Sequence, residues 1–265
     1  MPYCRFQTKQ GPQYGEVGLR AGEWWMERVI APPPEDLSVS QLAENERAQP
    51  LSALTLLAPV TPSKIVCIGR NYRDHAAELG NEPPKEPLLF LKPPSSLLPP
   101  GGVIRLPAQS QRVDYEGELG IVIGRTCSKL EPEQDVRPYI RGYVIVNDVT
   151  ARDLQKSDGQ WSRAKGFDTF CPVGPIVSDA VDPEAGVTVT TRLNGAVKQN
   201  GITTDFIFNI ATLLRYISAA MTLNPGDLIP TGTPVGVGPM QSGDVVEVEI
   251  DGLGTLGNPV LAQDA

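Results

Sequence analysis

Most apolar runs in this chain are short, and glycine or proline interrupts them before they reach the length of a typical helix. Six runs have the length and composition of strands: KIVCIG (64–69), PLLFLKP (87–93), GELGIVIG (117–124), YIRGYVIVND (139–148), VTVTTRLNG (187–195) and DVVEVEIDGLG (244–254). The 26 prolines add to this irregularity, because proline is excluded from helix interiors and central strands. The sequence therefore predicts a mostly-β protein with a few helices, in the α+β class.

One segment has a helical pattern instead. Its apolar residues recur at intervals of three and four, the period of an amphipathic helix: Phe206, Ile210, Leu213, Leu214 and Ile217. This pattern predicts a long helix over residues 204–221. A shorter helix is expected over RDHAAEL (73–79), ended by Gly80.

The first 58 residues differ from the rest in their pattern of apolar residues, glycine and proline. The stretch YGEVGLRAGEWWMERV alternates loosely and is broken by glycines, as hairpins are. Proline clusters follow in APPPEDLSVSQL and APVTPSK, and these are typical of linkers or rigid loops. We therefore expect a small strand-rich N-terminal domain over residues 1–58 and a larger domain over residues 59–265.

Charge and cysteine content narrow the partners and the compartment. The formal net charge is -8, the sequence pI is near 4.8, and no Lys/Arg cluster indicates a nucleic-acid partner. No apolar run approaches the ~20 residues of a membrane span, and the N-terminus lacks a signal-like apolar stretch. The four scattered cysteines predict reduced thiols in a cytoplasmic protein. An anionic substrate would need a local cation to hold it.

An acidic pair directly precedes a buried run in DYEGELGIVIG (114–124). Glu116 and Glu118 lie two apart in a predicted strand and so point to the same face. A solvated strand face would tolerate them, but beside a buried run carboxylates are costly unless paired or metal-bound. Asp148, at the end of another buried strand, is the best third ligand. Hard oxygen ligands suit Mg²⁺ or Mn²⁺, with Ca²⁺ as the weaker alternative.

Two further candidates could handle protons or charge. His75 is the one histidine of the sequence, and Glu78 follows it three residues later on the same predicted helix face. A carboxylate beside an imidazole orients it as a general base, although a solvated helix would look the same. Lys165, in SRAKGFDTFCP, lies in a segment that we expect outside the core, solvated unless the fold brings it to the metal.

Two glycine-rich stretches carry little signal by themselves. GLGTLG (252–257) fits a dinucleotide-binding pattern, but no helix can follow it in the eight residues that remain, so the match is accidental. TGTPVGVG (231–238) lacks the ending of a phosphate-binding loop, and its pattern favours a plain turn. Its backbone N–H groups could still line a pocket for a small anion.

Taken together, residues 60–260 resemble the fumarylacetoacetate hydrolase family, and in particular its short bacterial members. Seven runs match in the order of the family: KIVCIGRNYRDHAAELG, PLLFLKP, DYEGELGIVIG, GYVIVNDVTARDLQ, AKGFDTFCPVGP, LNGAVKQNG and GDLIPTGTPVGVGP. The resemblance implies a mixed β-roll fold and a homodimer. It places the divalent metal on Glu116, Glu118 and Asp148, and proton transfer on His75 and Glu78. It makes Lys165 an active-site cation and Arg70, Gln155 and Thr233 substrate contacts.

The resemblance also implies a chemistry. The expected enzyme cleaves or decarboxylates a 2-oxo acid through a metal-bound enolate, as an acylpyruvate hydrolase or an oxaloacetate decarboxylase does. The alternative is an isomerase or tautomerase of 2-hydroxy-diene-dioate or oxaloacetate substrates, which would use the same enolate without cleavage. A catalytically silent binding or structural homologue is a further alternative, and the intact set of candidate residues argues against it.

Overall fold

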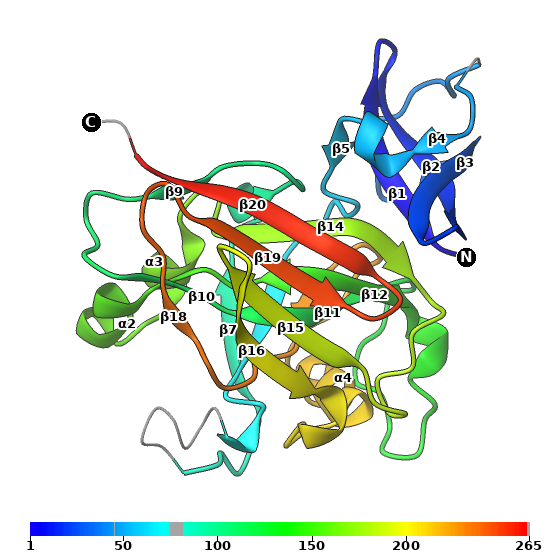
Figure 1. The fold of residues 1–265 in the computed structure, drawn as a ribbon. Helices are drawn as coiled ribbons and strands as arrows, with labels where there is room; N and C mark the ends of the chain where they lie inside the picture. The colour runs from blue at the N-terminus through cyan, green and yellow to red at the C-terminus, as the bar shows by residue number, and fades with distance from the viewer. Residues whose placement is uncertain (45, 75–81, 264–265) are drawn as a thin grey trace.

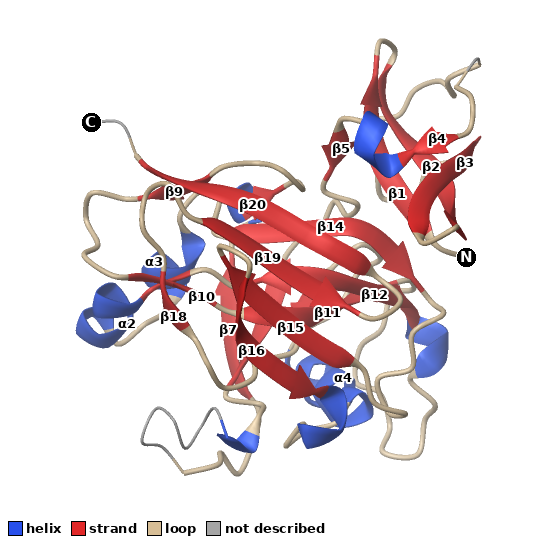
Figure 2. Cartoon of the chain, viewed as in Figure 1, coloured by secondary structure: helices blue, strands red, loops and turns tan. Residues whose placement is uncertain are grey.

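The computed structural model describes residues 1–44, 46–74 and 82–263 of the chain (Figure 1). Strands dominate these residues and helices are few and short (Figure 2), which confirms the predicted mostly-β class. The six predicted strands correspond to β6, β7, β11, β12, β15 and β19. Residues 252–257 form a turn that enters a strand, so the rejection of a dinucleotide-binding loop there is also confirmed.

The N-terminal strands form an antiparallel meander at one corner of the molecule (Figure 1). They are β1 (Tyr3–Thr8), β2 (Gly11–Arg20), β3 (Glu23–Ile30), β4 (Gln49–Pro50) and β5 (Leu56–Leu57). The meander is not isolated, because Tyr3 of β1 pairs with Val177 of β14. Phe6 and Met26 fill the core of the meander. The domain boundary at residue 58 stays a prediction.

The large sheet runs in the order β4–β3–β2–β1–β14–β12–β11–β17–β6–β7, with β5 and β8 attached at β1 and β14. Its remaining strands are β6 (Ile65–Gly69), β7 (Leu88–Lys92), β8 (Leu97–Leu98), β11 (Gly117–Ile123), β12 (Ile140–Asn147), β14 (Cys171–Ser178) and β17 (Leu228–Pro230). Every residue of β11 is buried. Strand β11 therefore lies in the middle of the protein, and anything attached to its ends is held on a rigid support.

A second sheet, in the order β16–β15–β19–β20–β9, lies over part of the first (Figure 1). Its strands are β9 (Ile104–Leu106), β15 (Thr188–Leu193), β16 (Ala196–Ile202), β19 (Val245–Ile250) and β20 (Gly254–Ala262). Leu119 and Ile145 of the large sheet pack there against Val189 and Val248. A small third sheet, in the order β13–β10–β18, consists of β10 (Val113–Tyr115), β13 (Thr150–Ala151) and β18 (Gly238–Pro239).

The helices within the described residues are α2 (Arg152–Asp158), α3 (Ser162–Gly166) and α4 (Ile210–Ala220). The same residues form the 3₁₀ turns η1 (Leu51–Ala53), η2 (Pro94–Ser96), η3 (Arg137–Tyr139) and η4 (Thr203–Asp205). Helix α4 packs on β11 and β6, its Leu213 and Leu214 lying against Ile121 and Ile68. The helix expected around His75 falls outside the described residues. The described helices include none with the length and apolarity that crossing a membrane requires.

The start of α4 corrects the sequence-based boundary. The predicted helix began at residue 204, whereas α4 begins at Ile210. The Oδ1 atom of Asn209 accepts the N–H of Thr212 at 2.9 Å and so caps the first turn. Phe206 precedes the helix and packs edge-on against Tyr72, 5.0 Å away between ring centroids. The apolar periodicity extended past the cap because the half-buried Phe206 packs on Tyr72 and not as part of the helix.

This cap gives a test of the fold. Replacing Asn209 by Ala removes the acceptor for an otherwise unpaired helix N–H, which typically costs about 1 kcal/mol. We expect that loss in the free energy of unfolding measured with urea. Asn209→Asp should retain most of the stability, because its side-chain oxygen can accept the same N–H. Equal stability of the Ala variant and the parent would show that the cap contributes nothing.

Candidate active site

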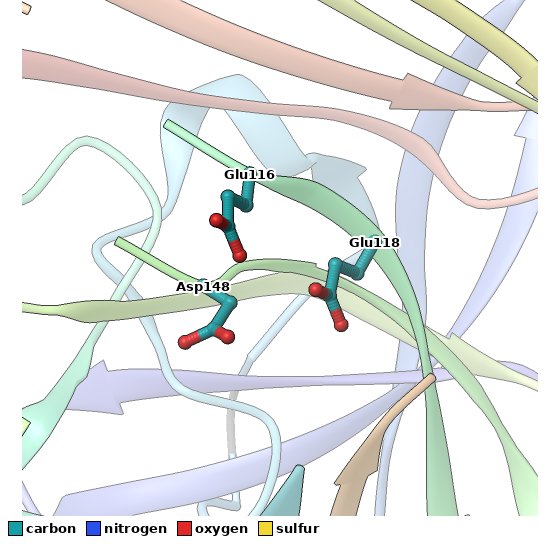
Figure 3. Close-up of side chains that lie close together, drawn as sticks. All are labelled: Glu116, Glu118 and Asp148. Atoms are coloured by element: carbon teal, nitrogen blue, oxygen red, sulfur yellow. The ribbon is translucent and has the colours of Figure 1, made fainter. Parts of the chain in front are cut away.

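The three carboxylates predicted to form a metal site come together in the folded chain. Glu116 occupies the single position between β10 and β11, Glu118 lies one residue into β11, and Asp148 directly follows β12. Strands β11 and β12 are paired with Gly117 opposite Asn147, and the N–H of Asp148 donates to the carbonyl of Glu116 at 2.8 Å. The carboxyl groups point toward one another (Figure 3), with one oxygen from each within 4.8 Å of the others.

Cations surround two of these buried carboxylates. Glu116 accepts hydrogen bonds from Arg152 Nη2 at 2.5 Å and from Lys165 Nζ at 2.7 Å. Lys165 Nζ also donates to Asp148 at 2.5 Å, so one ammonium group bridges two of the three acids. The other oxygen of Asp148 accepts from Lys92 Nζ at 2.5 Å. These charge-assisted bonds offset part of the repulsion between the acids.

The environment of Lys165 differs from the sequence-based expectation. The residues around Lys165 indicated a segment outside the core, with a solvated side chain unless the fold carried it to the acids, but Lys165 is buried on α3 with 2% of its surface exposed. Burial lowers its pKa, yet the opposing charges of Asp148 and Glu116 outweigh burial and raise the pKa above its ordinary value. The side chain is therefore a permanent ammonium ion. The expectation was wrong because glycine and serine around Lys165 indicated a loop, whereas packing of α3 carries it inward.

Burial of the Glu118 carboxylate has a clear electrostatic cost. Its pKa lies well above the ordinary range, first because of burial and then because of the charges of Asp148 and Glu116. The N–H of Gly232 donates to its Oε2 at 2.8 Å and lowers the cost slightly. A divalent cation would remove this penalty, since it favours the ionised form of all three acids. Three buried carboxylates at this spacing fit Mg²⁺ or Mn²⁺.

Sequence analysis missed Lys92 as part of this site. Lys92 is 2% exposed, and besides Asp148 its ammonium donates to the carbonyl oxygens of Phe170 at 2.8 Å and Val149 at 3.3 Å. The signal was available, because a lysine that ends the apolar run LLFLK must be paired if the strand is buried. The partner could not be identified from sequence, since Asp148 is 56 residues away.

A second missed pair supports Glu116 from the other side. Arg152 opens α2, and its Nε donates to the fully buried Asp114 at 2.9 Å. The exposed Arg112 donates to the same carboxylate at 2.9 Å. Arg152 thus joins Asp114 to Glu116 and holds both carboxylates in fixed positions.

The remaining sequence-predicted residues line one small pocket over the acids. This pocket, about 40 Å³ in volume, includes the predicted residues Arg70, Glu116, Glu118, Gln155, Lys165 and Thr233. Arg70 follows β6 with a left-handed backbone (φ 57°), which non-glycine residues rarely adopt. Trp161 forms part of the wall and packs at 5.3 Å against Phe90. His75 and Glu78 lie outside the described residues, and their roles stay predictions.

The loop of residues 231–237 also belongs to the site, although its sequence pattern favoured a plain turn. Gly232 donates to Glu118, and the Thr233 hydroxyl donates to the Gly117 carbonyl at 2.8 Å. A larger hollow of about 580 Å³ lies elsewhere, beside Tyr143 and Arg215, and contains none of the predicted site residues. Charge pairing and burial, rather than cavity size, therefore mark the site.

Comparison with known proteins agrees with this geometry. Residues 64–261 match the family model described as "Fumarylacetoacetate (FAA) hydrolase C-terminal". The chain belongs to the fumarylacetoacetate hydrolase family. The resemblance seen in the sequence is thereby confirmed, and the fold is the one expected for that family.

Relatives within the fumarylacetoacetate hydrolase family carry several activities in their names. The oxaloacetate tautomerase YisK of Bacillus subtilis is 43% identical, over 79% of this chain and 74% of its own. The structure of a 2-hydroxyhepta-2,4-diene-1,7-dioate isomerase from Mycobacterium marinum is 44% identical and superposes over the full length of both chains (TM-score 0.87). A fumarylpyruvate hydrolase from Pseudomonas aeruginosa, solved with Mn²⁺ and pyruvate, is 33% identical (78% of this chain, 91% of that one, TM-score 0.70).

The raised pKa of Glu118 predicts a pH-dependent effect of Glu118→Gln. In the unfolded chain a glutamate ionises at about pH 4.3, whereas the buried Glu118 resists ionisation. The free energy of unfolding of the metal-free protein therefore falls as the pH rises above that value. The glutamine variant avoids this loss and keeps an acceptor for Gly232. By calorimetry with chelator, we expect similar melting temperatures near pH 4 and a higher one for the variant at pH 7.

The same variant tests the metal site. Addition of Mn²⁺ should raise the melting temperature of the parent through binding to the native state and leave that of Glu118→Gln unchanged. An equal Mn²⁺-dependent rise in both proteins would remove Glu118 from the ligand set. A metal-free variant that melts below the parent at pH 7 would contradict the cost assigned to the carboxylate.

Lys92→Met tests the buried ion pair with Asp148. The substitution keeps the apolar part of the side chain but removes one of the cations that face the Asp148 carboxylate. Breaking a buried ion pair in this way typically lowers the free energy of unfolding by about 3–5 kcal/mol. We expect a loss of that size in urea denaturation of the metal-free protein. The double variant Lys92→Met/Asp148→Asn should recover much of it, because no unpaired charge remains. The exposed Lys156→Met is the control, and a single variant as stable as the parent would contradict the assignment.

Proposed function

We propose that this protein is a divalent-metal-dependent enzyme that interconverts the keto and enol forms of a small 2-oxo dicarboxylic acid such as oxaloacetate. The observation that carries the proposal is the buried cluster of Glu116, Glu118 and Asp148, bridged by Lys165 at the base of a polar pocket. Such a cluster is expensive to fold, and with a divalent cation bound it would be suited to stabilising negative charge that develops on a substrate.

The metal would be held by the three acids. When bound, Mg²⁺ or Mn²⁺ supplies a Lewis acid and a template that orients the substrate carboxylate and the 2-oxo oxygen. Mn²⁺ is the ion present in the fumarylpyruvate hydrolase structure, which is consistent with this choice of metals. The cations Lys92, Lys165 and Arg152 are already paired with the acids, so the bound divalent cation would supply the positive charge that attracts an anionic substrate to a chain of net charge -8.

The residues of the pocket divide the remaining work. The Lys165 ammonium, permanently charged, would stabilise the negative charge that gathers on the 2-oxo oxygen as a proton leaves C3. Arg70, Gln155 and Thr233 line the same pocket and offer donors for substrate carboxylates. In tautomerisation the C3 proton is removed and the oxygen is protonated, with no bond between carbons broken. We assign the proton transfer to His75, oriented by Glu78.

Tautomerisation ranks ahead of the cleavage reactions that the sequence favoured. It needs the charge-stabilising step and one proton shuttle, and the relative named oxaloacetate tautomerase is 43% identical, against 33% for the fumarylpyruvate hydrolase. Hydrolysis of an acylpyruvate is the second candidate, because it uses the same step and adds an activated water. Decarboxylation of oxaloacetate is a third candidate, which uses the same charge-stabilising step but needs no attacking water. The expected homodimer and cytoplasmic location stay predictions.

The decisive experiment follows the enol absorbance of oxaloacetate with Mg²⁺, with Mn²⁺ and with chelator, and identifies products by NMR. We expect metal-dependent acceleration of the approach to the keto–enol equilibrium, with oxaloacetate recovered intact. Acetylpyruvate, fumarylpyruvate and a hydroxyheptadienedioate serve as competing substrates. Faster cleavage of an acylpyruvate, or release of pyruvate and CO₂, would replace the proposal by one of its alternatives, and no metal-dependent activity on any substrate would refute it.

Two variants test the assigned roles in the same assay. Lys165→Met should lower kcat by about 10²–10³, as loss of one charge-stabilising donor does. His75→Ala should lower kcat by about 10²–10⁴, as loss of a general base does, and leave the affinity for Mn²⁺ unchanged. Lys156→Met, an exposed lysine on α2, is the matched control and should act like the parent. Full activity of either active-site variant would remove its residue from the mechanism.

A further inference from the structure

We propose that Gln199 is a positioning residue that locks the backbone between the two glutamate ligands to the pocket loop carrying Thr233. The inference rests on the proposed metal site, and it assigns a task to a residue that lies on the second sheet. Gln199 is 1% exposed, although it belongs to β16, an edge strand whose other residues are exposed or half-buried. An edge strand that buries one side chain, and buries a carboxamide, indicates a specific polar partner.

The hydrogen bonds of Gln199 use the whole carboxamide. Its Oε1 accepts the N–H of Gly117 at 3.0 Å, and its Nε2 donates to Thr233 Oγ1 and to the Pro234 carbonyl, each at 2.8 Å. The Thr233 hydroxyl then donates to the carbonyl of Gly117 at 2.8 Å. We call this arrangement of Gln199, Thr233 and Gly117 the Gln199 latch. It satisfies both the N–H and the carbonyl of Gly117, and its hydrogen bonds hold the carboxamide of Gln199 in one orientation.

The latch replaces a missing strand neighbour. On the edge that faces β17, strand β11 is paired over Gly120–Val122, and Thr231 extends the bonding to the carbonyl of Leu119. Gly117 lies beyond the end of that ladder. Without Gln199 and Thr233, the N–H and the carbonyl of Gly117 would lose these hydrogen-bond partners while buried, which lowers the stability of the folded state. The side chains of Gln199 and Thr233 therefore do for Gly117 what the backbone N–H of Thr231 does for the carbonyl of Leu119.

The position of Gly117 sets the direction of both glutamates. Glu116 and Glu118 flank it, so any rotation of the backbone at Gly117 moves both carboxylates relative to Asp148. From the other side Gly117 is held by packing, since a Cβ there would lie 2.1 Å from Thr191 Oγ1. The latch and this contact leave the backbone little freedom. Because Thr233 lines the substrate pocket, the latch also ties the pocket loop to the metal ligands.

The first test measures Mn²⁺ binding by calorimetry in Gln199→Met, which retains volume but cannot form the latch. We expect at least about tenfold weaker binding, as is typical when the groups that orient metal ligands are lost, and a raised KM through Thr233. The control is Val189→Ala, a cavity variant in the neighbouring strand β15 that lowers stability without touching the latch. Its Mn²⁺ affinity should match the parent. Parental affinity and KM in a folded Gln199→Met would overturn the proposal.

A second pair of variants keeps the proposal testable if Gln199→Met does not fold. Thr233→Ser retains the hydroxyl and should bind Mn²⁺ like the parent, whereas Thr233→Val breaks the latch and should show the same weakening as Gln199→Met. The double variant Gln199→Met/Thr233→Val should be no weaker than either single variant, because they remove one unit. Parental affinity in Thr233→Val, or additive losses in the double variant, would contradict the latch.

Hydrogen exchange separates this proposal from the proposed function. In metal-free protein the amide of Gly117 should exchange markedly faster in Gln199→Met and Thr233→Val than in the parent, Thr233→Ser and Val189→Ala. If the parent binds no Mn²⁺ but this difference is found, the metal site fails and the latch stands. If the parent binds Mn²⁺ and exchange at Gly117 is the same in all variants, the latch fails alone.

Discussion

Three buried carboxylates, with one oxygen of each within 4.8 Å of the others, impose the electrostatic constraint that the residues around them must satisfy. Like charges at that distance in a poorly solvated site repel strongly, and the raised pKa of Glu118 records the cost. The surrounding architecture answers that repulsion. Lys92, Lys165 and Arg152 bring positive charge, and the N–H of Gly232 brings a dipole. A divalent cation would offset the repulsion between the acids that remains.

Rigidity makes such an arrangement possible. Glu116 directly precedes the fully buried strand β11 and Glu118 lies in it. Asp148 directly follows the antiparallel neighbour β12, and α3 brings Lys165 to Glu116 and Asp148. These supports come from distant parts of the chain, so the acids cannot separate without disrupting the core. Groups that are held against their own repulsion are preorganised for a charge that forms during reaction. The buried acids lower the free energy of unfolding, and packing of the surrounding sheets offsets that loss.

Sequence patterns predicted much of this, and their failures have physical causes. The strands were recognised because apolar runs bounded by glycine and proline have few alternatives, and the acids were recognised because charge next to a buried run needs an explanation. Helix α4 was predicted to begin six residues too early, since Phe206 fits the period but packs on Tyr72. The segment around Lys165 was expected outside the core, and Lys92 and Gln199 were missed, because a polar residue shows its burial only through partners far along the chain.

The sequence by itself determined the mostly-β class, the family and the identity of the three acids. These follow from local composition and from the order of short motifs, which need no knowledge of distant contacts. The tertiary structure alone decided which cation faces which carboxylate, that Lys165 is buried, and that a glutamine on the second sheet completes the bonding of Gly117. Charge pairing and hydrogen bonding act over a few ångströms in space, and only folding brings residues 82 positions apart to that distance.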